Sequence, residues 1–414
     1  MKARKEVNEV YFVACGGSQA VLMAGQYMFD KESSIPSHVY TANEFVYDTP
    51  KRLNENSVVI SCSHSGNTPE TVEATKLARS KGALTICLSN LEGSPLWEAA
   101  EYPVHYDWGK EVSDSDKNKG ILYGLLFSLL SVLAPDAKWD VCLKELEKLT
   151  DLSAQAKAQY DAQAKAWAKR NKREKTIYTI GSGINYGEVY STAMCWFMEM
   201  QWINSGCIHS GEYFHGPFEV TDYDVPFMLV KSIGHTRHLD ERVENFAKKF
   251  TEDLLVLDQK DLDLSTVADE AKPYVAAILT GVVIRHFVEA IASSVVTHSM
   301  FVVICGRCST KIQYEEENIC RLNWLFFDVD GLLLDTERVW QDVWYDTARD
   351  FGIDDWKRED FLNVVGRSGQ PVYDYMEELF RGRCSTEEFM KVARQHGVER
   401  LERELTAKPG AWNS

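Results

Sequence analysis

The sequence has no uninterrupted apolar run of the roughly 18 residues that a membrane helix needs. The run from Ile121 to Ala134 stops at Pro135, and the stretch from Val275 to Val303 is interrupted by charged residues. Both segments therefore predict buried helices of a globular core. A secretory signal is also lacking, because Glu6 and Glu9 precede the first short apolar run and no cleavage-site pattern follows it.

Positive charge is scarce. Lysine and arginine total 45 against 62 aspartates and glutamates, which gives a net charge of −17 and a pI near 5.1. This balance argues against a nucleic-acid partner and against an anionic membrane surface. An anionic small substrate would need a dedicated local cradle. The composition, 45% hydrophobic and 26% charged, is otherwise that of an ordinary soluble protein with room for two or three domains.

The ten cysteines do not form a recognisable metal or disulfide framework. Most lie inside apolar runs and are expected to be reduced core thiols, which favours a cytoplasmic protein; examples are Cys62, Cys87, Cys142 and Cys195. A single CxxC, Cys305–Cys308, has no second pair, and Cys320 alone does not complete a metal site. No metal is therefore expected.

Two β-prone runs near the N-terminus each end in a loop rich in glycine and hydroxyl residues. The first, Val10 to Ser18, closes on Cys-Gly-Gly-Ser, and the second, Ser57 to Cys62, is followed by Ser63-His-Ser-Gly-Asn-Thr-Pro-Glu-Thr71. A helix should start in this second loop, because Thr68 is a good N-cap and Pro69 suits the first helical position.

The second loop is a candidate anion cradle. Backbone N–H groups are available at Gly66 and Asn67, and the helix N-terminus contributes the positive end of its dipole. Hydroxyl groups come from Ser63, Ser65 and Thr68. Plain helix capping is the commoner explanation for one such loop, but two of them on neighbouring strands favour a ligand. In a parallel sheet both loops would lie beyond the carboxyl ends of the strands, where ligands bind.

The remaining strand and helix patterns predict an α/β fold of two similar lobes with parallel sheets flanked by helices. Further strands are expected at 83–88, 102–107, 225–230 and 254–258. The run Thr176–Ile184 repeats the pattern of Val10–Ser18, which indicates an internal repeat. We expect a first lobe at 8–138, a helical connection at 139–174 and a second lobe at 175–314.

Carboxylates and imidazoles crowd the stretch from Phe197 to Glu219. Glu199 lies among aromatic and methionine residues, so we expect its carboxyl to be poorly solvated, with a raised pKa and stronger basicity. His215 sits in a Phe-His-Gly-Pro turn that should hold its ring still. A buried glutamate in a polar network and a turn-capping histidine are the alternative. Lower-ranked candidates in this stretch and the cradle loop are His64, His209, Glu212 and Glu219.

Four segments together resemble one family: Cys15-Gly-Gly-Ser18, Ser63-His-Ser-Gly-Asn-Thr68, Phe197-Met-Glu199 and Gly211-Glu-Tyr-Phe-His-Gly-Pro217. Over roughly residues 8 to 300 the chain is similar to the double sugar isomerase (SIS) domain proteins. Among these it looks most like the fructosamine-6-phosphate deglycases, relatives of the isomerase half of glucosamine-6-phosphate synthase.

The resemblance implies roles for particular residues. It assigns Glu199 and His215 to catalysis. It assigns the sugar phosphate to the loop residues Ser63, Ser65 and Thr68, with Ser18 beside them. From their places in the chain, Gly17 and Glu212 are also expected to bind the substrate, Glu212 at its amine. It further implies a phosphorylated fructosamine substrate, no cofactor, and a homodimer whose active sites are shared, so that His215 acts on a neighbour's substrate.

The implied chemistry begins with ring opening, in which His215 relays a proton. Glu199 then removes a proton from C1 to form an enaminol, and return of a proton to C2 leaves an imine that water hydrolyses to glucose 6-phosphate and an amine. An aldose–ketose isomerase or an amino-sugar phosphate deaminase would begin in the same way. A non-catalytic sugar-phosphate sensor is a further alternative.

The C-terminal part departs from this family. The segment Phe301–Thr310 does not match the family's closing tail, although Lys311-Ile-Gln-Tyr314 resembles its end. The run Trp324–Glu337 resembles the first motif of haloacid dehalogenase-like phosphatases, with Asp328 as nucleophile and Asp330 as acid/base. The segment 322–414 ends before the later motifs of that fold, so we expect a mostly helical, incomplete fragment without phosphatase activity. Joining of two adjacent reading frames, the second truncated, would explain it.

Overall fold

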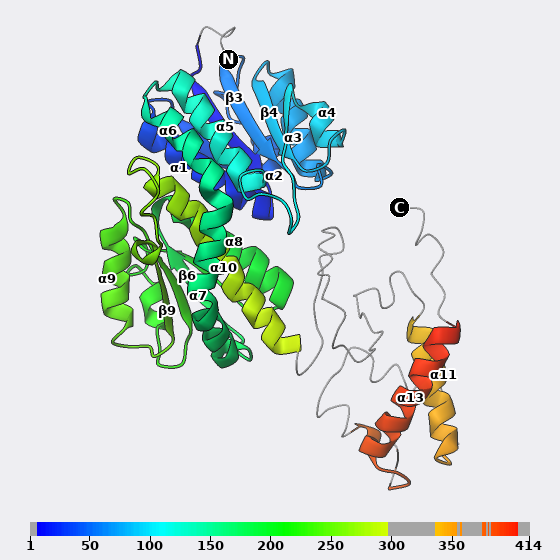
Figure 1. The fold of residues 1–414 in the computed structure, drawn as a ribbon. Coiled ribbons are helices and arrows are strands. Elements are labelled where there is room, and N and C mark those ends of the chain that lie inside the picture. Colours follow the sequence, from blue (N-terminus) through cyan, green and yellow to red (C-terminus); the bar gives the residue numbers. More distant parts are fainter. Residues whose placement is uncertain are drawn as a thin grey trace. The chain divides into compact units, whose positions relative to one another are not determined.

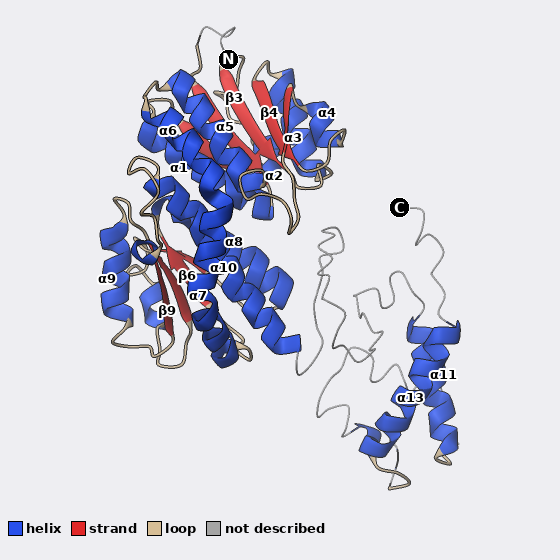
Figure 2. Ribbon diagram, in the orientation of Figure 1, coloured by secondary structure: helices blue, strands red, loops and turns tan. Residues whose placement is uncertain are grey.

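A computed structural model describes residues 6–296, 336–353, 357, 375–377, 380 and 382–404. The chain divides into two compact units, Met1–Lys311 and Ile312–Ser414 (Figure 1). The first unit contains two parallel β-sheets with helices packed around them (Figure 2). The fold is α/β, as the sequence predicts.

The first sheet has the strand order β2-β1-β3-β4-β5, and every neighbouring pair is parallel. Its strands are β1 (Glu9–Ala14), β2 (Ser37–Thr41), β3 (Ser57–Cys62), β4 (Leu84–Ser89) and β5 (Tyr102–His105). Its helices are α1 (Gly16–Glu32), α2 (Ala42–Tyr47), α3 (Pro69–Ser80), α4 (Pro95–Ala99) and α5 (Asn118–Leu133).

The central strands β1, β3 and β4 are buried along their whole length because helices cover both faces of the sheet. Phe12 and Ile60 belong to a core shared with α1 and α5, whereas Tyr11 and Val59 point the other way and pack with α2 and α3. A strand buried on both sides shows no alternation of polar and apolar residues, which is why these runs are continuous in the sequence.

The second sheet repeats the order of the first, β7-β6-β8-β9, and is again parallel. Its strands are β6 (Tyr178–Gly181), β7 (Cys207–His209), β8 (Phe227–Lys231) and β9 (Leu254–Asp258), and its helices include α8 (Tyr186–Ser191) and α9 (Arg237–Ala247). The loops after the first strands match in backbone conformation, since Gly16 has φ +55° and Gly183 has φ +59°. The predicted internal repeat is therefore present in the structure.

Three further helices connect the two sheets: α6 (Lys138–Glu145), α7 (Leu149–Asn171) and α10 (Lys272–Val296). One continuous core runs from the first sheet through α5, α7 and α10 to the second sheet. By length and composition α10 could cross a membrane, but 67% of its apolar window is buried inside the protein. The prediction that this segment and α5 are buried core helices is confirmed.

The sequence prediction missed the strands β2 and β7. Each lies at one edge of its sheet, as do β5 and β9, which were predicted. β7 has only three residues, and the β2 sequence Ser-His-Val-Tyr-Thr is only partly buried. A short or partly exposed strand is stabilised mainly by pairing with its neighbour, so its local pattern is weak.

The second unit contains the helices α11 (Thr336–Asp350) and α13 (Thr386–Glu404). They pack through a small apolar cluster in which the rings of Trp344 and Phe389 lie 5.8 Å apart. The predicted catalytic motif around Asp328 and Asp330, the tail 301–314 and the cysteines near 305–320 lie outside the described residues.

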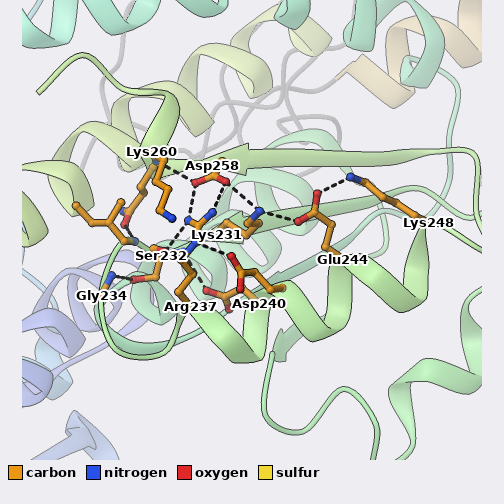
Figure 3. Close-up of polar contacts among 12 residues, drawn as sticks. Lys231, Ser232, Gly234, Arg237, Asp240, Glu244, Lys248, Asp258 and Lys260 are labelled. Carbon is orange, nitrogen blue, oxygen red and sulfur yellow. Dashed lines mark hydrogen bonds and ion pairs between the residues drawn. The ribbon is translucent and has the colours of Figure 1, made fainter.

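A network of charged residues joins α9 to the ends of β8 and β9 (Figure 3). The Arg237 guanidinium donates two hydrogen bonds of 2.7 Å to the two carboxylate oxygens of Asp258, and the side chains are only 15% and 14% exposed. Lys231 lies 3.0 Å from Asp258 and 2.7 Å from Glu244. Removing one partner of a largely buried ion pair leaves an uncompensated charge.

We therefore expect Arg237→Ala to lower the free energy of unfolding at pH 7 by about 3 kcal/mol, measured by urea unfolding of the full chain. Lys248→Ala is the matched control, because this lysine joins the same network but is 59% exposed, and it should cost no more than about 0.5 kcal/mol. Equal losses of unfolding free energy in the two variants would contradict the conclusion that the ion pair of Arg237 with Asp258 stabilises the fold.

The effect of Arg237→Ala should shrink in acid. Burial alone would raise the pKa of Asp258, but the hydrogen bonds from Arg237, the Lys260 N–H and Lys231 outweigh burial and hold that pKa well below its usual range. A carboxyl whose pKa is lower in the folded state stabilises the fold above its unfolded pKa of about 4 and loses this contribution as pH falls further. The two chains should thus differ less at pH 3 than at pH 7.

Candidate functional site

The two glycine–hydroxyl loops of the first lobe lie at one edge of the sheet. Strands β1 and β3 are parallel neighbours, with Ala14 opposite Cys62 at their carboxyl ends. The chain passes from β1 to β2 on one side and returns to β3 on the other. Ligands in open parallel sheets bind at such a point, where the strand order reverses.

The backbone of the second loop is held in place around Gly66. Its φ is +64°, and a Cβ built there would lie 1.9 Å from the Ser94 Oγ. The Gly66 N–H donates to the Ser63 carbonyl over 3.1 Å, and the Gly66 carbonyl accepts from the Leu96 N–H over 3.0 Å. Only glycine fits here, because the position combines a left-handed conformation with close contact.

The hydroxyls of Ser63 and Thr68 contact each other across the loop, with their oxygens 2.9 Å apart. Thr68 occupies the N-cap position of α3, as predicted, but its side chain makes no capping hydrogen bond to the helix. One hydroxyl proton of the pair suffices for the bond between them, so the other remains available to an acceptor. Ser65 accepts a hydrogen bond of 3.2 Å from the Asn67 N–H, which tightens the same loop.

The loop after β1 lies beside this cradle. Burial raises the pKa of the Cys62 thiol to about 12, and a hydrogen bond with Ser18 partly offsets that effect. Ser18 and Gly17 form the first turn of α1. A Cβ on Gly17 would lie 3.6 Å from the Cys195 sulfur, in ordinary van der Waals contact. The first turn of α1 therefore lies close to a helix of the second lobe.

That helix is a π-helix, Thr192–Glu199, and Glu199 is its last residue. Such wide turns are rare and occur frequently at functional sites. Phe197 is fully buried, but Glu199 itself is exposed. The prediction of a poorly solvated Glu199 is thus wrong for the single chain. Side chains radiate around a helix axis, so apolar neighbours in the sequence do not bury the glutamate between them.

A stack of aromatic and cationic side chains links the loop after β3 to the π-helix. The ring of His64 lies 5.2 Å from that of Trp108, and the Arg285 guanidinium lies 5.5 Å from the Trp108 ring and 5.2 Å from the Trp196 ring. Contacts of this kind are typical cation–π geometry. The cradle and the helix that carries Glu199 thus converge within one chain.

His64, a lower-ranked candidate, packs within the loop. Its Nδ1 lies 3.0 Å from the Tyr106 hydroxyl, and burial lowers the pKa of His64. A lowered pKa keeps this imidazole neutral at pH 7.

His215 lies elsewhere, on the turn 210–216 that follows β7. Its backbone N–H donates to the Glu212 carbonyl over 2.9 Å, and the side chains of both residues are exposed, as is that of Glu219. His209 packs edge-on against the Tyr186 ring, with centroids 5.3 Å apart. Within the described part of the chain, no hydrogen bond or ion pair joins His215 to Glu199.

The structure also contains a residue that the sequence prediction missed. Asp240, in the first turn of α9, is fully buried. Its carboxylate accepts hydrogen bonds from the hydroxyls of Ser182 (2.7 Å) and Ser210 (2.6 Å) and from the Ser232 N–H (2.9 Å). Burial raises the pKa of this carboxyl, and these hydrogen bonds offset part of the rise. In the sequence it stands among charged residues typical of an exposed helix face. No group of three or more metal-binding side chains occurs among the described residues.

A model of the SIS domain matches residues 5–134. The chain is 45% identical over 289 residues to fructosamine deglycase FrlB of Bacillus subtilis, an alignment that covers 70% of this chain and 88% of that protein. The chain belongs to the SIS-domain fructosamine deglycase family.

Other members and structures agree with this assignment. Fructoselysine 6-phosphate deglycase of Escherichia coli K12 is 27% identical over 263 residues, covering 63% of this chain and 75% of that protein. A solved Bacillus subtilis structure described as a candidate phosphosugar isomerase is 44% identical, with a TM-score of 0.69 over 70% of this chain and 89% of that one. A Salmonella typhimurium structure with the same description is 35% identical, with a TM-score of 0.68 over 71% and 89%.

Proposed function

We propose that the chain is a fructosamine-6-phosphate deglycase, which releases an amino acid from its adduct with fructose 6-phosphate and forms glucose 6-phosphate. One observation supports it above others: the hydroxyl-lined loop after β3 and the π-helix ending at Glu199 are linked by the stack of side chains that runs from His64 to Trp196. A phosphate bound in the cradle would direct the carbon chain of the sugar toward this helix. The 45% identity to a fructosamine deglycase points to the same activity.

Each group of residues has a separate role in the reaction. The Ser63 and Thr68 hydroxyls and the amides of the loop bind the phosphate, and His215 transfers the proton that opens the sugar ring. The Glu199 carboxylate takes a proton from C1 and returns it to C2, which converts the ketosamine through an enaminol into a C1 imine. Water adds to C1, the C–N bond breaks, and glucose 6-phosphate and the amine leave.

The exposure of Glu199 and His215 supports a site that a second copy of the chain completes. Trp202, just beyond the π-helix, is 65% exposed, and Met194 within it is 41% exposed. Large apolar side chains beside an exposed glutamate favour an interface. We propose a homodimer in which His215 of one chain serves the Glu199 site of the other.

Mixed dimers test this arrangement. If the sites are shared, co-expression of Glu199→Gln with His215→Ala should restore roughly a quarter of wild-type activity. Half of the dimers that form at random are mixed, and each of these has one intact site out of two. The two variants assayed alone should be inactive. No recovery in confirmed mixed dimers would place both residues in sites of single chains.

Product analysis distinguishes the deglycase from its rivals. The purified full chain with fructoselysine 6-phosphate should release glucose 6-phosphate and lysine in equal amounts. An aldose–ketose isomerase would instead convert fructose 6-phosphate and release no amino acid. Stabilisation of the chain by the phosphorylated ligand, without turnover, would indicate a sensor and contradict the proposal.

We also propose the domain limits 8–138, 139–174, 175–314 and 322–414, and a cytoplasmic location. The buried cysteines Cys62, Cys87 and Cys142 are free thiols, which suits a reducing compartment.

A further inference from the structure

The second lobe has a counterpart of the phosphate cradle. The counterpart lies between β6 and β8, where the strand order of the second sheet reverses in the same way. The loops there begin at Ser182 and Ser232. In this lobe, however, a carboxylate of the protein itself, that of Asp240, accepts hydrogen bonds from the Ser182 hydroxyl and from the Ser232 N–H. Figure 3 shows Asp240 beside Ser232.

The hydrogen bonds to Asp240 join the ends of three strands. Ser182 follows β6, Ser210 follows β7 and Ser232 follows β8. Ser182 and Ser210 are 0% and 2% exposed, and Asp240 is 0% exposed. A carboxylate buried to this extent is costly unless donors satisfy it, so the three donors are held firmly. Arg237 adds a hydrogen bond of 3.0 Å to the Ser232 carbonyl.

Ser210 is the first residue of the turn 210–216, which carries Glu212 and His215. Its N–H donates to the Gly181 carbonyl over 2.9 Å, and its hydroxyl donates to Asp240 over 2.6 Å. The rest of the turn has local hydrogen bonds, such as that from the His215 N–H to the Glu212 carbonyl. Tyr213 and Phe214 also pack against Phe246 of α9, and the Arg242 guanidinium lies 4.0 Å from the Phe214 ring. Among the described residues, the bond from Ser210 to Asp240 is the only side-chain hydrogen bond from the turn to α9.

We propose that Asp240 is a positioning residue, which acts through the Ser210 hydroxyl to hold the turn 210–216 and thereby the His215 imidazole in place for ring opening. This inference rests on the proposed deglycase function. Its mechanism is geometric: a displacement of about 1 Å at a catalytic group costs up to about a hundredfold in rate.

Two serines allow a matched test. Ser182 and Ser210 are both buried and donate to the same oxygen of Asp240 at nearly the same distance, but only Ser210 lies on the His215 turn. Ser210→Ala should lower kcat about tenfold and leave KM for the phosphorylated substrate within about twofold, because the phosphate cradle lies in the first lobe. Ser182→Ala should leave kcat within about twofold while lowering the melting temperature as much as Ser210→Ala does.

Asp240→Asn is the third variant. Asparagine keeps the shape, and its amide nitrogen can donate to the serine hydroxyls while its oxygen accepts from the Ser232 N–H. A folded Asp240→Asn chain should show a kcat between those of wild type and Ser210→Ala. Equal kcat losses in the two serine variants, or an unchanged kcat in Ser210→Ala, would overturn the proposal.

Hydrogen exchange separates this inference from the deglycase assignment. Amides of residues 211–215 should exchange faster in Ser210→Ala than in Ser182→Ala, whether or not the chain turns over the substrate. If the wild-type chain does not turn over the substrate, the proposed function is wrong, but the role of Asp240 in holding the turn is not contradicted. If the turn exchanges at the same rate in the two variants, the hydrogen bond from Ser210 to Asp240 does not hold the turn.

Discussion

Glu199→Gln should lower kcat of the full chain by about 10²–10⁴-fold, because the amide cannot accept the C1 proton. Glutamine has nearly the same shape and Glu199 is exposed, so the fold should persist. The phosphorylated substrate should still raise the melting temperature of the variant, since the cradle in the first lobe is unchanged. Coupled detection of glucose 6-phosphate measures the loss.

The matched control for this prediction is Glu98→Gln, which changes another exposed glutamate, on α4. It should keep wild-type kcat. A Glu199→Gln chain that retains more than about a tenth of wild-type kcat would exclude Glu199 as the base.

Gly66→Ala should both destabilise the chain and weaken phosphate binding. The new Cβ would lie 1.9 Å from the Ser94 Oγ, in a backbone with φ +64°. The left-handed conformation costs about 1–2 kcal/mol, and overpacking adds about 1–3 kcal/mol. The loop must shift to relieve the contact, so KM for the phosphorylated substrate should rise at least about tenfold, a shift of about 1.4 kcal/mol.

Gly93→Ala separates the two causes. Gly93 has φ +68°, but a Cβ there meets no atom within 4 Å. This control should cost only about 1–2 kcal/mol and leave KM unchanged. Equal effects of the two substitutions on stability and KM would mean that the contact with Ser94 does not hold the phosphate loop.

Much of the fold was predictable because long buried strands and helices have strong local patterns. Runs such as Ser57–Cys62 and Leu254–Asp258 are β-prone, and the echo between Val10–Ser18 and Thr176–Ile184 reflects a real repeat of strand order. The strands β2 and β7 were missed because β2 is only partly buried and β7 has only three residues, so neither has a strong local pattern.

The candidate site was predictable only in part. The glycine and hydroxyl pattern of residues 63–68 located the loop, because the backbone conformation and the donors are local properties of those residues. The sequence could not show that Thr68 bonds to Ser63 instead of capping α3, since the choice between these partners depends on how the loop closes.

Residue types and their order in the chain were enough to predict the α/β class, the duplicated lobe, the glycine and hydroxyl loop after β3 and the resemblance to deglycases. Tertiary packing alone decided that Glu199 is exposed, that Arg285 lies between Trp108 and Trp196, and that Asp240 is buried among three strand ends. The physical reason is the separation along the chain of the residues that determine each property. Backbone conformation and helix capping depend on adjacent residues, whereas the solvation of a side chain depends on which distant segments pack around it.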